Sequence, residues 1–410
     1  MSTRALLLLV GLIGGAELLV RGHLANHAPA FHAGAWLLAV SLVVATRGRA
    51  AWLRIGAAAL AGVCALLSLA ELLPGRAALT VQPSPSFDAA LGDPEALRLW
   101  WEAHADARKI LRGETPLVPG QRFSLFSSEV ELDELGIRRT TPPRAGAWRI
   151  VVLGDSATFG ATQNGSEQPW PDLLAREIEK AYACERPVEV RNAGKPGRSL
   201  RDMGASFDAQ VAPLAPDLLV VYPGIDAFDG LLPRSDSLER TSSEPRASRW
   251  LEALERPLRA RIDARRLRAA LDAAPEPELL RRSPAARGYR SLLVAARAHG
   301  VDVALVPVAL AVRVDSPDRA IRFHEAVWPE TRWLVVANQN HTRLLPLLAV
   351  AYRAEVLDPP ADLDGAWQDG FIDLFHFTQT GSERLARHVA KSLEPLLARG
   401  AGCKPRPIAH

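Results

Sequence analysis

Short apolar runs alternate with segments of helical pattern from residue 149 to the end of the chain, and this alternation constrains the fold more than any other feature. The runs that are typical of buried strands are 149–153 (RIVVL), 187–192 (PVEVRN), 217–222 (DLLVVY), 301–308 (VDVALVPV) and 354–358 (AEVLD). The helical patterns cover 170–183, 200–214, 289–298, 341–352 and 381–397. Such apolar strands need cover on both faces, so the pattern predicts an α/β domain over 149–400 with a mostly parallel, five-stranded, doubly wound sheet.

One long polar segment interrupts this alternation after the third strand. Residues 230–288 are rich in arginine and contain helical stretches such as SRWLEALERPLRARIDARRLRAAL. Structureless loops of this length are uncommon inside a compact domain, so we expect a helical insertion. Three interpretations stay open for it: a lid, a surface that lies on anionic lipid, or a solvated insertion.

The first 74 residues contain three long apolar segments, at 5–21, 28–46 and 55–73. Each is close to the ~20 residues that a helix needs to cross a bilayer. No A-x-A-like cleavage site follows the first, so a membrane anchor of three helices is favoured over a signal peptide. A buried helical hairpin is the alternative.

Arginine placement predicts the orientation of these spans. Arg4 precedes the first span, and Arg47, Arg49 and Arg54 lie between the second and the third. Positively charged flanks stay in the cytoplasm, so three crossings would put every later residue outside. We therefore expect a multi-pass protein of the cytoplasmic (inner) membrane, with its α/β domain on the outer, periplasmic side.

Residues 75–148 connect the two parts. The stretch 94–111 has the pattern of an amphipathic helix, with Asp93 placed to cap it. Residues 122–144 alternate like an edge strand or a hairpin and then break at two prolines.

Composition excludes several classes of function. The chain is 48% hydrophobic with a formal net charge of +3, which is too apolar for disorder and too balanced for a nucleic-acid binder. The three cysteines have no CxxC spacing, so neither a zinc site nor a dithiol redox motif is indicated. No metal or nucleotide cofactor is expected.

Polar residues follow the predicted strands at the points where they end. Gly154-Asp155-Ser156 follows the first strand, Asn192-Ala193-Gly194 the second and Gly224-Ile225-Asp226 the third. Asp373 and His376 lie between the fifth strand and the last helix. The carboxyl ends of parallel strands share one edge of a sheet, so we expect these segments to meet there.

These residue types suit nucleophilic catalysis. Ser156 is the candidate nucleophile, His376 its base, and Asp373 the acid that orients the imidazole. Backbone N–H groups of Ser156 and Gly194 are the expected oxyanion donors. The alternatives are that Ser156 only caps a helix and that Asp373 and His376 are a cap and a surface histidine.

Together these segments resemble the SGNH/GDSL hydrolase superfamily. VVLGDSATFG resembles the block that carries the nucleophile, VRNAGKPGRS the block with the oxyanion glycine, and DLFHFTQTGSERLARHVAKSL the block with the acid and base. The resemblance implies a flavodoxin-like fold, with Gly154, Asp155, Asn192 and Gly224 supporting the site. ELDELGIRR also resembles the stretch before the core in membrane-anchored envelope members.

One position departs from the family pattern. The third block is Gly-x-Asn-Asp, whose asparagine donates to the oxyanion, whereas this chain has Asp226 at that place. An ionised Asp226 offers no donor, although a protonated one would.

The resemblance implies an acyl hydrolase or acyltransferase that acts on small O-acyl groups of envelope glycans or glycolipids, with polysaccharide-modification proteins as partners. Two alternatives stay open. One is a catalytically weakened domain that binds an acylated glycan in a polysaccharide assembly. The other is a lipid-directed lysophospholipase or thioesterase.

Two cysteines are candidates for a disulfide. Cys184 ends the helix after the first strand, and Cys403 follows the last helix. In flavodoxin-like topologies these two helices share one face of the sheet and end away from the active edge. An outward-facing domain would permit the bond. Cys64 lies in the third apolar segment and is assigned to packing.

Overall fold

The computed structural model describes residues 94–126, 128–139, 144–160, 168–231, 269, 274–325, 327–367 and 369–407. They belong to one of the two compact units of the chain, made of 83–234 and 267–410. The three predicted membrane spans, Asp93 and most of the predicted insertion lie outside the described residues. Among the described helices, none combines the length and the apolar character that a membrane crossing needs.

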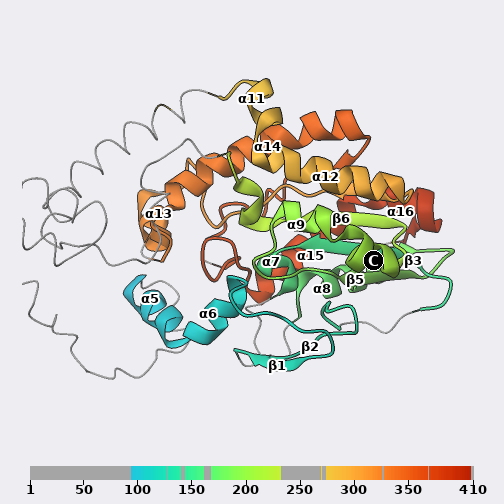
Figure 1. Cartoon of the computed structure of the whole chain (residues 1–410), viewed down its shortest axis with the longest axis horizontal. Helices are drawn as coiled ribbons and strands as arrows, with labels where there is room; N and C mark the ends of the chain where they lie inside the picture. The colour runs from blue at the N-terminus through green and yellow to red at the C-terminus, as the bar shows by residue number, and fades with distance from the viewer. Residues whose placement is uncertain are drawn as a thin grey trace, which may run out of the picture. The chain divides into compact units, whose positions relative to one another are not determined.

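The central sheet has five strands, and each of its pairings is parallel. The spatial order is β5-β3-β6-β7-β8, which is the flavodoxin-like order (Figure 1). The prediction of a mostly parallel, five-stranded sheet is confirmed. The strands are β3 (Trp148–Gly154), β5 (Val188–Asn192), β6 (Leu218–Tyr222), β7 (Asp302–Leu305) and β8 (Glu355–Val356).

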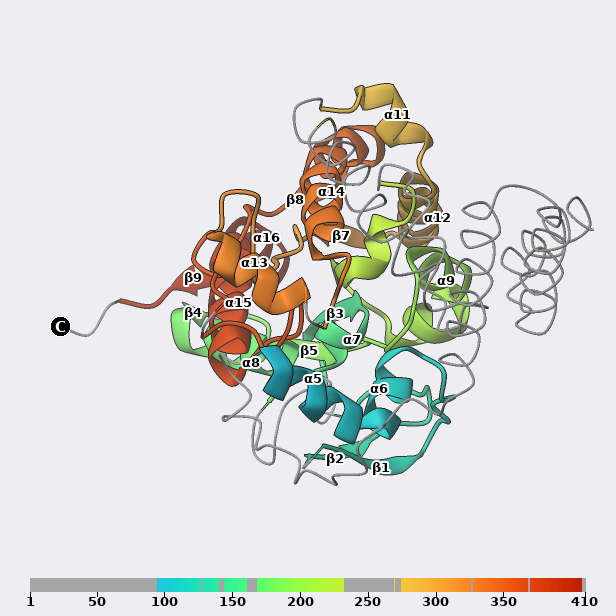
Figure 2. The same ribbon diagram turned by 90° about the vertical axis from the view of Figure 1, so that its left-hand side faces the viewer.

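Helices cover both faces of this sheet, as Figure 2 shows. On one side α8 packs against α15, and on the other α9 packs against α12, which in turn packs against α14. The helices of the domain are α8 (Trp170–Ala181), α9 (Leu200–Ala205), α11 (Pro277–Arg282), α12 (Pro284–Ala298), α13 (Asp318–Glu325), α14 (Thr331–Tyr352), α15 (Gln379–Ser392) and α16 (Glu394–Ala401).

Prolines explain where the predicted helix bounds are wrong. The segment 200–214 is α9 followed by a π-helical turn (Phe207–Val211) and a 3-10 turn, because Pro213 lacks a backbone N–H. The last helix is divided in two, with Pro395 in the first turn of α16. Helix α12 begins at Pro284, five residues early, because the Ser283 hydroxyl accepts the Ala286 N–H at 3.1 Å.

Two further helices differ from the prediction. Helix α14 begins at Thr331, ten residues before the predicted start, and continues through Pro346. Helix α13 was not predicted. Its eight residues are too few for a periodic pattern to stand out from a loop.

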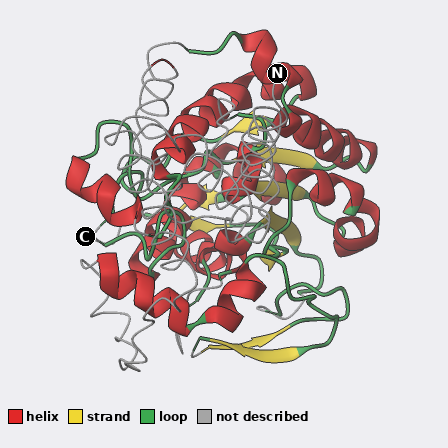
Figure 3. Ribbon diagram, turned by 60° about the vertical axis from the view of Figure 1, so that its left-hand side comes forward, coloured by secondary structure: helices red, strands yellow, loops and turns green. Residues whose placement is uncertain are grey.

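The connector packs onto the domain. It forms α5 (Pro94–Ala103), α6 (Ala105–Leu111) and a hairpin of β1 (Arg122–Leu125) and β2 (Ser128–Glu131), which lies apart from the main sheet (Figure 3). The single helix predicted over 94–111 is interrupted at His104, whose imidazole bonds to the Trp100 carbonyl at 2.7 Å. A second apolar core joins Trp100, Trp101 and Leu111 to Phe159 of the domain.

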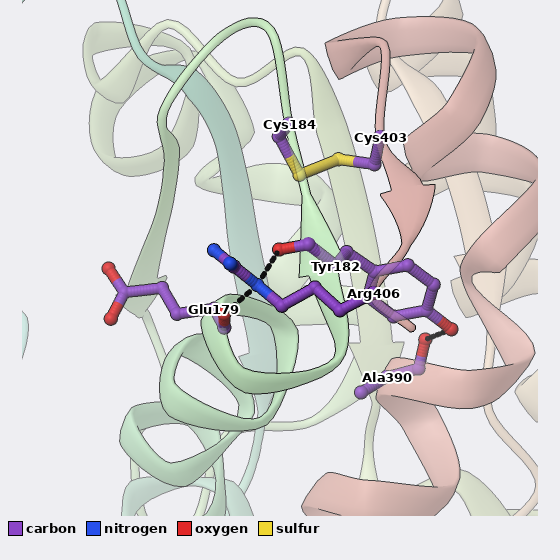
Figure 4. Close-up of a disulfide and its surroundings, with 6 residues drawn as sticks. All are labelled: Glu179, Tyr182, Cys184, Ala390, Cys403 and Arg406. Atoms are coloured by element: carbon purple, nitrogen blue, oxygen red, sulfur yellow. Dashed lines mark hydrogen bonds between the residues drawn. A yellow bond between two sulfur atoms is a disulfide. The ribbon is translucent and has the colours of Figure 1, made fainter. Parts of the chain in front are cut away.

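A disulfide joins Cys184 to Cys403, the pairing expected from the sequence (Figure 4). It lies beside a short antiparallel pair, β4 (Tyr182–Ala183) and β9 (Lys404–Pro405). Arg406 closes the same junction, since its Nε–H donates to the carbonyl of Tyr182 at 3.0 Å. The bond therefore ties the carboxyl-terminal segment to the end of α8.

Replacing Cys403 with serine is expected to lower the free energy of unfolding by roughly 2–5 kcal/mol, because the bond closes a long loop. The sequence separation of the two cysteines is 219 residues. Urea denaturation with and without dithiothreitol measures the change. Reduced wild-type protein should match Cys403→Ser, and the reductant should leave the variant unchanged. Equal stability of reduced and oxidised wild-type protein would contradict the expectation.

Candidate active site

Ser156, the predicted nucleophile, lies on a tight turn at the end of β3. Helix α7 (Ser156–Phe159) is a single turn, and the Asp155 side chain caps it by accepting the Ala157 N–H at 2.9 Å. Ser156 is therefore not the cap, so that alternative is wrong. The turn also requires Gly154, because a Cβ there would lie 2.0 Å from the Tyr222 carbonyl oxygen.

Ser156, His376 and Asp373 form one chain of hydrogen bonds. The Ser156 hydroxyl donates to His376 Nε2 at 2.9 Å, and His376 Nδ1–H donates to Asp373 Oδ2 at 2.8 Å. All three side chains are buried, with exposed fractions of 5%, 3% and 0%. His376 is thus neither at the surface nor separated from the serine. The arrangement suits proton removal from Ser156 by His376.

The Asp373 carboxylate is held ionised. Burial acts to raise its pKa, but the charge of His376 and hydrogen bonds from His376 and Phe375 outweigh burial and hold the pKa of Asp373 below its ordinary value. Its Oδ1 accepts the N–H groups of His376 and Phe375 at 2.8 and 3.0 Å. Trp328 Nε1–H donates to Oδ2 at 3.3 Å. A carboxylate fixed in this way holds the imidazole in one tautomer.

The role predicted for the Gly194 N–H is wrong. That N–H donates to Asn192 Oδ1 at 3.0 Å, so it is already used. Asn192 also donates to the Thr158 carbonyl at 3.0 Å, which ties the second strand end to α7. Gly197, three residues later, lines the pocket beside Ser156 and His376. Within the described residues, neither the Ser156 N–H nor the Gly197 N–H has an acceptor.

Comparison with known proteins identifies the family. A family model described as the GDSL-like Lipase/Acylhydrolase family matches residues 152–384, more than half of the chain. The chain belongs to this family. It is a serine hydrolase of the acylhydrolase type, and the match includes all three residues of the hydrogen-bonded chain.

Solved structures are also similar to this acylhydrolase. A lipase/acylhydrolase from Enterococcus faecalis is 18% identical with a TM-score of 0.38, and the match covers 63% of this chain and 98% of that one. A variant of an acetylxylan esterase from Geobacillus stearothermophilus is 15% identical with a TM-score of 0.38, covering 61% and 95%. No curated protein matches this chain in sequence.

The acylhydrolase triad opens into a pocket of about 210 Å³. Trp101 from α5 lines it together with Trp328 and Phe375, and the Trp101 ring centre lies 6.1 Å from that of His376. A larger cavity of about 620 Å³ lies elsewhere and contains none of the triad residues. We therefore assign the chemistry to the smaller pocket, whose walls combine these aromatic rings with aliphatic and charged side chains.

Two further carboxylic acids line this pocket. Burial, followed by the charge of Asp226, raises the pKa of Asp155 well above its ordinary value. Burial, followed by the charge of Asp202, raises the pKa of Asp226 to about 6. Gly224 lets the backbone before Asp226 lie against the Asp155 carboxyl group, because a Cβ on Gly224 would lie 1.9 Å from Asp155 Oδ2. Asp226 is thus a group whose protonation changes close to neutral pH.

Four of the residues that shape the site were missed by sequence reasoning. Trp101 follows Trp100 on α5 and Trp328 lies in a loop, and no sequence signal assigns either of them to the site. Arg138 is buried and its Nη1 donates to the carbonyls of Phe159 and Gly160, both at 2.8 Å, at the end of α7. Its one signal was the ELDELGIRR stretch that contains it. Gly197 had a signal too, since it is the second glycine of NAGKPG.

Proposed function

We propose that this acylhydrolase removes small O-acyl groups from glycans or glycolipids of the cell envelope, on the outer side of the cytoplasmic membrane. The observation that carries the proposal is the Ser156–His376–Asp373 chain of hydrogen bonds at a pocket of about 210 Å³. Pockets that take drug-sized ligands have roughly 300–1,000 Å³, so this one suits a short acyl chain.

The disulfide supports the outward location. Bonds such as Cys184–Cys403 persist in oxidising compartments and are rare in the cytosol. The three apolar segments before residue 74 would hold the domain at the membrane, close to envelope glycans. Partners in polysaccharide modification would then be within reach.

The reaction would follow from the positions of the triad atoms. Ser156 Oγ attacks the ester carbonyl carbon while His376 Nε2 takes the hydroxyl proton, and Asp373 stabilises the imidazolium. His376 then gives the proton to the leaving alcohol, which leaves an acyl-serine. Water attacks that ester with His376 again as base, releases the acid and restores Ser156. A sugar hydroxyl in place of water would make the protein an acyltransferase.

The developing oxyanion would be held by backbone donors. The N–H groups of Ser156 and Gly197 are free to donate to it within the described residues. Asp226 lines the same pocket and would add a third donor only while protonated.

An ester series tests the proposal. With 4-nitrophenyl acetate and octanoate, kcat/KM is expected to fall about tenfold or more on going to the longer chain, because aromatic walls exclude extra methylenes. Trp101→Ala should widen the pocket and so reduce the difference in kcat/KM between the two esters. Trp100→Ala is the matched control, since Trp100 is buried next to Trp101 but does not line the pocket.

Ser156→Ala supplies the background rate for both esters. A preference for octanoate would instead favour the lysophospholipase or thioesterase alternative. Rates of folded wild-type protein equal to those of Ser156→Ala would favour the glycan-binding alternative.

A further inference from the structure

Helix α6 brings two arginines to the active-site pocket. Its carboxyl-terminal end packs on the loop that follows β5, where a Cβ on Gly197 would lie 2.6 Å from both the Arg112 carbonyl oxygen and Gly113 Cα. Leu111 is buried in the pocket wall, and Arg108 lies one helical turn before Arg112. Both arginines line the same pocket as Ser156 and His376. The contact at Gly197 fixes this placement, because neither glycine leaves room for a side chain.

The Arg108 guanidinium has no counter-ion of its own. Within the described residues it makes no ion pair or side-chain hydrogen bond, whereas the neighbouring Lys109 pairs with Asp106 at 3.1 Å. Arg112 lies 3.8 Å from Glu114, and both of these side chains are exposed. Burial, followed by the like charge of Arg112, lowers the pKa of Arg108 from its ordinary value. The charges of Glu102, Asp373 and Glu114 act in the opposite direction on Arg108 without pairing with it. Two cations are thus held together beside Ser156, and in the described part of the chain the exposed Glu114 is the carboxylate that pairs with one of them.

In the described part of the chain, Asp155, Asp226 and Asp373 form no ion pair with these two arginines. Burial raises the pKa of Asp155 well above its ordinary value, and Asp373 is engaged with His376. The aromatic side chains Trp101, Trp328 and Phe375 form the apolar wall that suits an acyl chain, whereas the arginines are half-buried or exposed.

We propose that the alcohol portion of the substrate carries an anionic group, a carboxylate or a phosphate, which Arg108 and Arg112 bind. This inference rests on the proposed esterase function and narrows its substrate class to acyl esters of acidic sugars or phosphorylated alcohols. A guanidinium matches both anions, because its N–H groups bind two oxygens at once. The anion would orient the ester so that its carbonyl meets Ser156.

Matched aryl acetates test the proposal with the full-length chain in neutral detergent micelles. The measured quantity is the ratio of kcat/KM for 4-acetoxybenzoate to kcat/KM for its neutral methyl ester. Arg108→Gln is expected to lower this ratio about tenfold or more, the usual size of a hydrogen bond to a charged group. Arg108→Lys should restore part of it. Arg297→Gln is the control of equal charge change, because Arg297 is exposed and does not line the pocket.

The outcomes separate this inference from the function on which it rests. An unchanged ratio in both Arg108→Gln and Arg112→Gln, with the neutral ester still cleaved, overturns the inference and leaves the esterase function intact. Loss of cleavage of all esters to the Ser156→Ala level in wild-type protein overturns the function, and the inference with it. A third substrate, 4-acetoxyphenyl phosphate, identifies the preferred anion. If its kcat/KM exceeds that of 4-acetoxybenzoate, the preferred group is a phosphate, and otherwise it is a carboxylate.

Discussion

Asp373→Asn is expected to lower kcat about 10⁴-fold for any ester that the protein cleaves. In the wild-type protein Asp373 accepts the proton of His376 Nδ1 at 2.8 Å, which leaves Nε2 free to take the proton of Ser156. An asparagine amide in the same place would donate to Nδ1 and put the imidazole proton on Nε2. His376 could then no longer act as a base toward Ser156. Steady-state kinetics with 4-nitrophenyl acetate measures the loss.

Asp369→Asn is the matched control for this variant. Asp369 is exposed, lies four residues earlier and pairs with Arg384 rather than with the triad. Its replacement should leave kcat within about twofold, as for most surface changes. Thermal unfolding of both variants verifies that the fold is retained. A loss of less than tenfold in Asp373→Asn would show that another group orients His376.

Asp226→Asn is expected to raise kcat/KM at pH 8 by up to about a hundredfold, the usual size of one oxyanion donor. The pKa of Asp226 is raised to about 6, so at pH 8 the wild-type side chain is ionised, has no donor and repels the oxyanion. Below pH 6 the wild-type carboxyl is protonated and can donate. The increase in kcat/KM that Asp226→Asn causes should therefore be largest at alkaline pH and become smaller as the pH falls through 6.

The ratio of kcat/KM between variant and wild type, measured from pH 5 to pH 8.5, tests this sign. Asp229→Asn is the control, because Asp229 is exposed and does not line the pocket. A ratio that stays flat with pH would place Asp226 outside the oxyanion site.

The sheet and the three triad residues were predictable because their signals are local. Each strand is a short run of apolar residues, and a parallel sheet brings the strand ends to one edge. Gly154-Asp155-Ser156 and Asp373-Leu374-Phe375-His376 follow from that rule, and the structure brings them within hydrogen-bond distance. The membrane anchor and its orientation stay predictions, because residues 5–73 lie outside the described part of the chain.

The oxyanion donor was not predictable in the same way. Gly194 and Gly197 both follow β5, and sequence alone does not say which N–H is free. In the structure Asn192 folds back to accept the Gly194 N–H, which leaves the Gly197 N–H as the proposed donor, and the chain turns at Gly197, whose φ is +67°. The predicted ends of two helices were wrong for a related reason. The periodicity of apolar residues continues past Pro213 and Pro395, although a proline interrupts the hydrogen bonding of a helix.

The order of the five sheet strands, the candidate nucleophile and its candidate base follow from the sequence, because residue pattern and spacing act over short distances along the chain. The groups that surround them follow from tertiary packing. Trp101 and Arg108 come from the connector, and Arg138 comes from the stretch before β3, yet all three pack at or beside the Ser156 turn. Their positions depend on how the connector buries its apolar face against Phe159, and that long-range packing leaves no periodic trace in the chain.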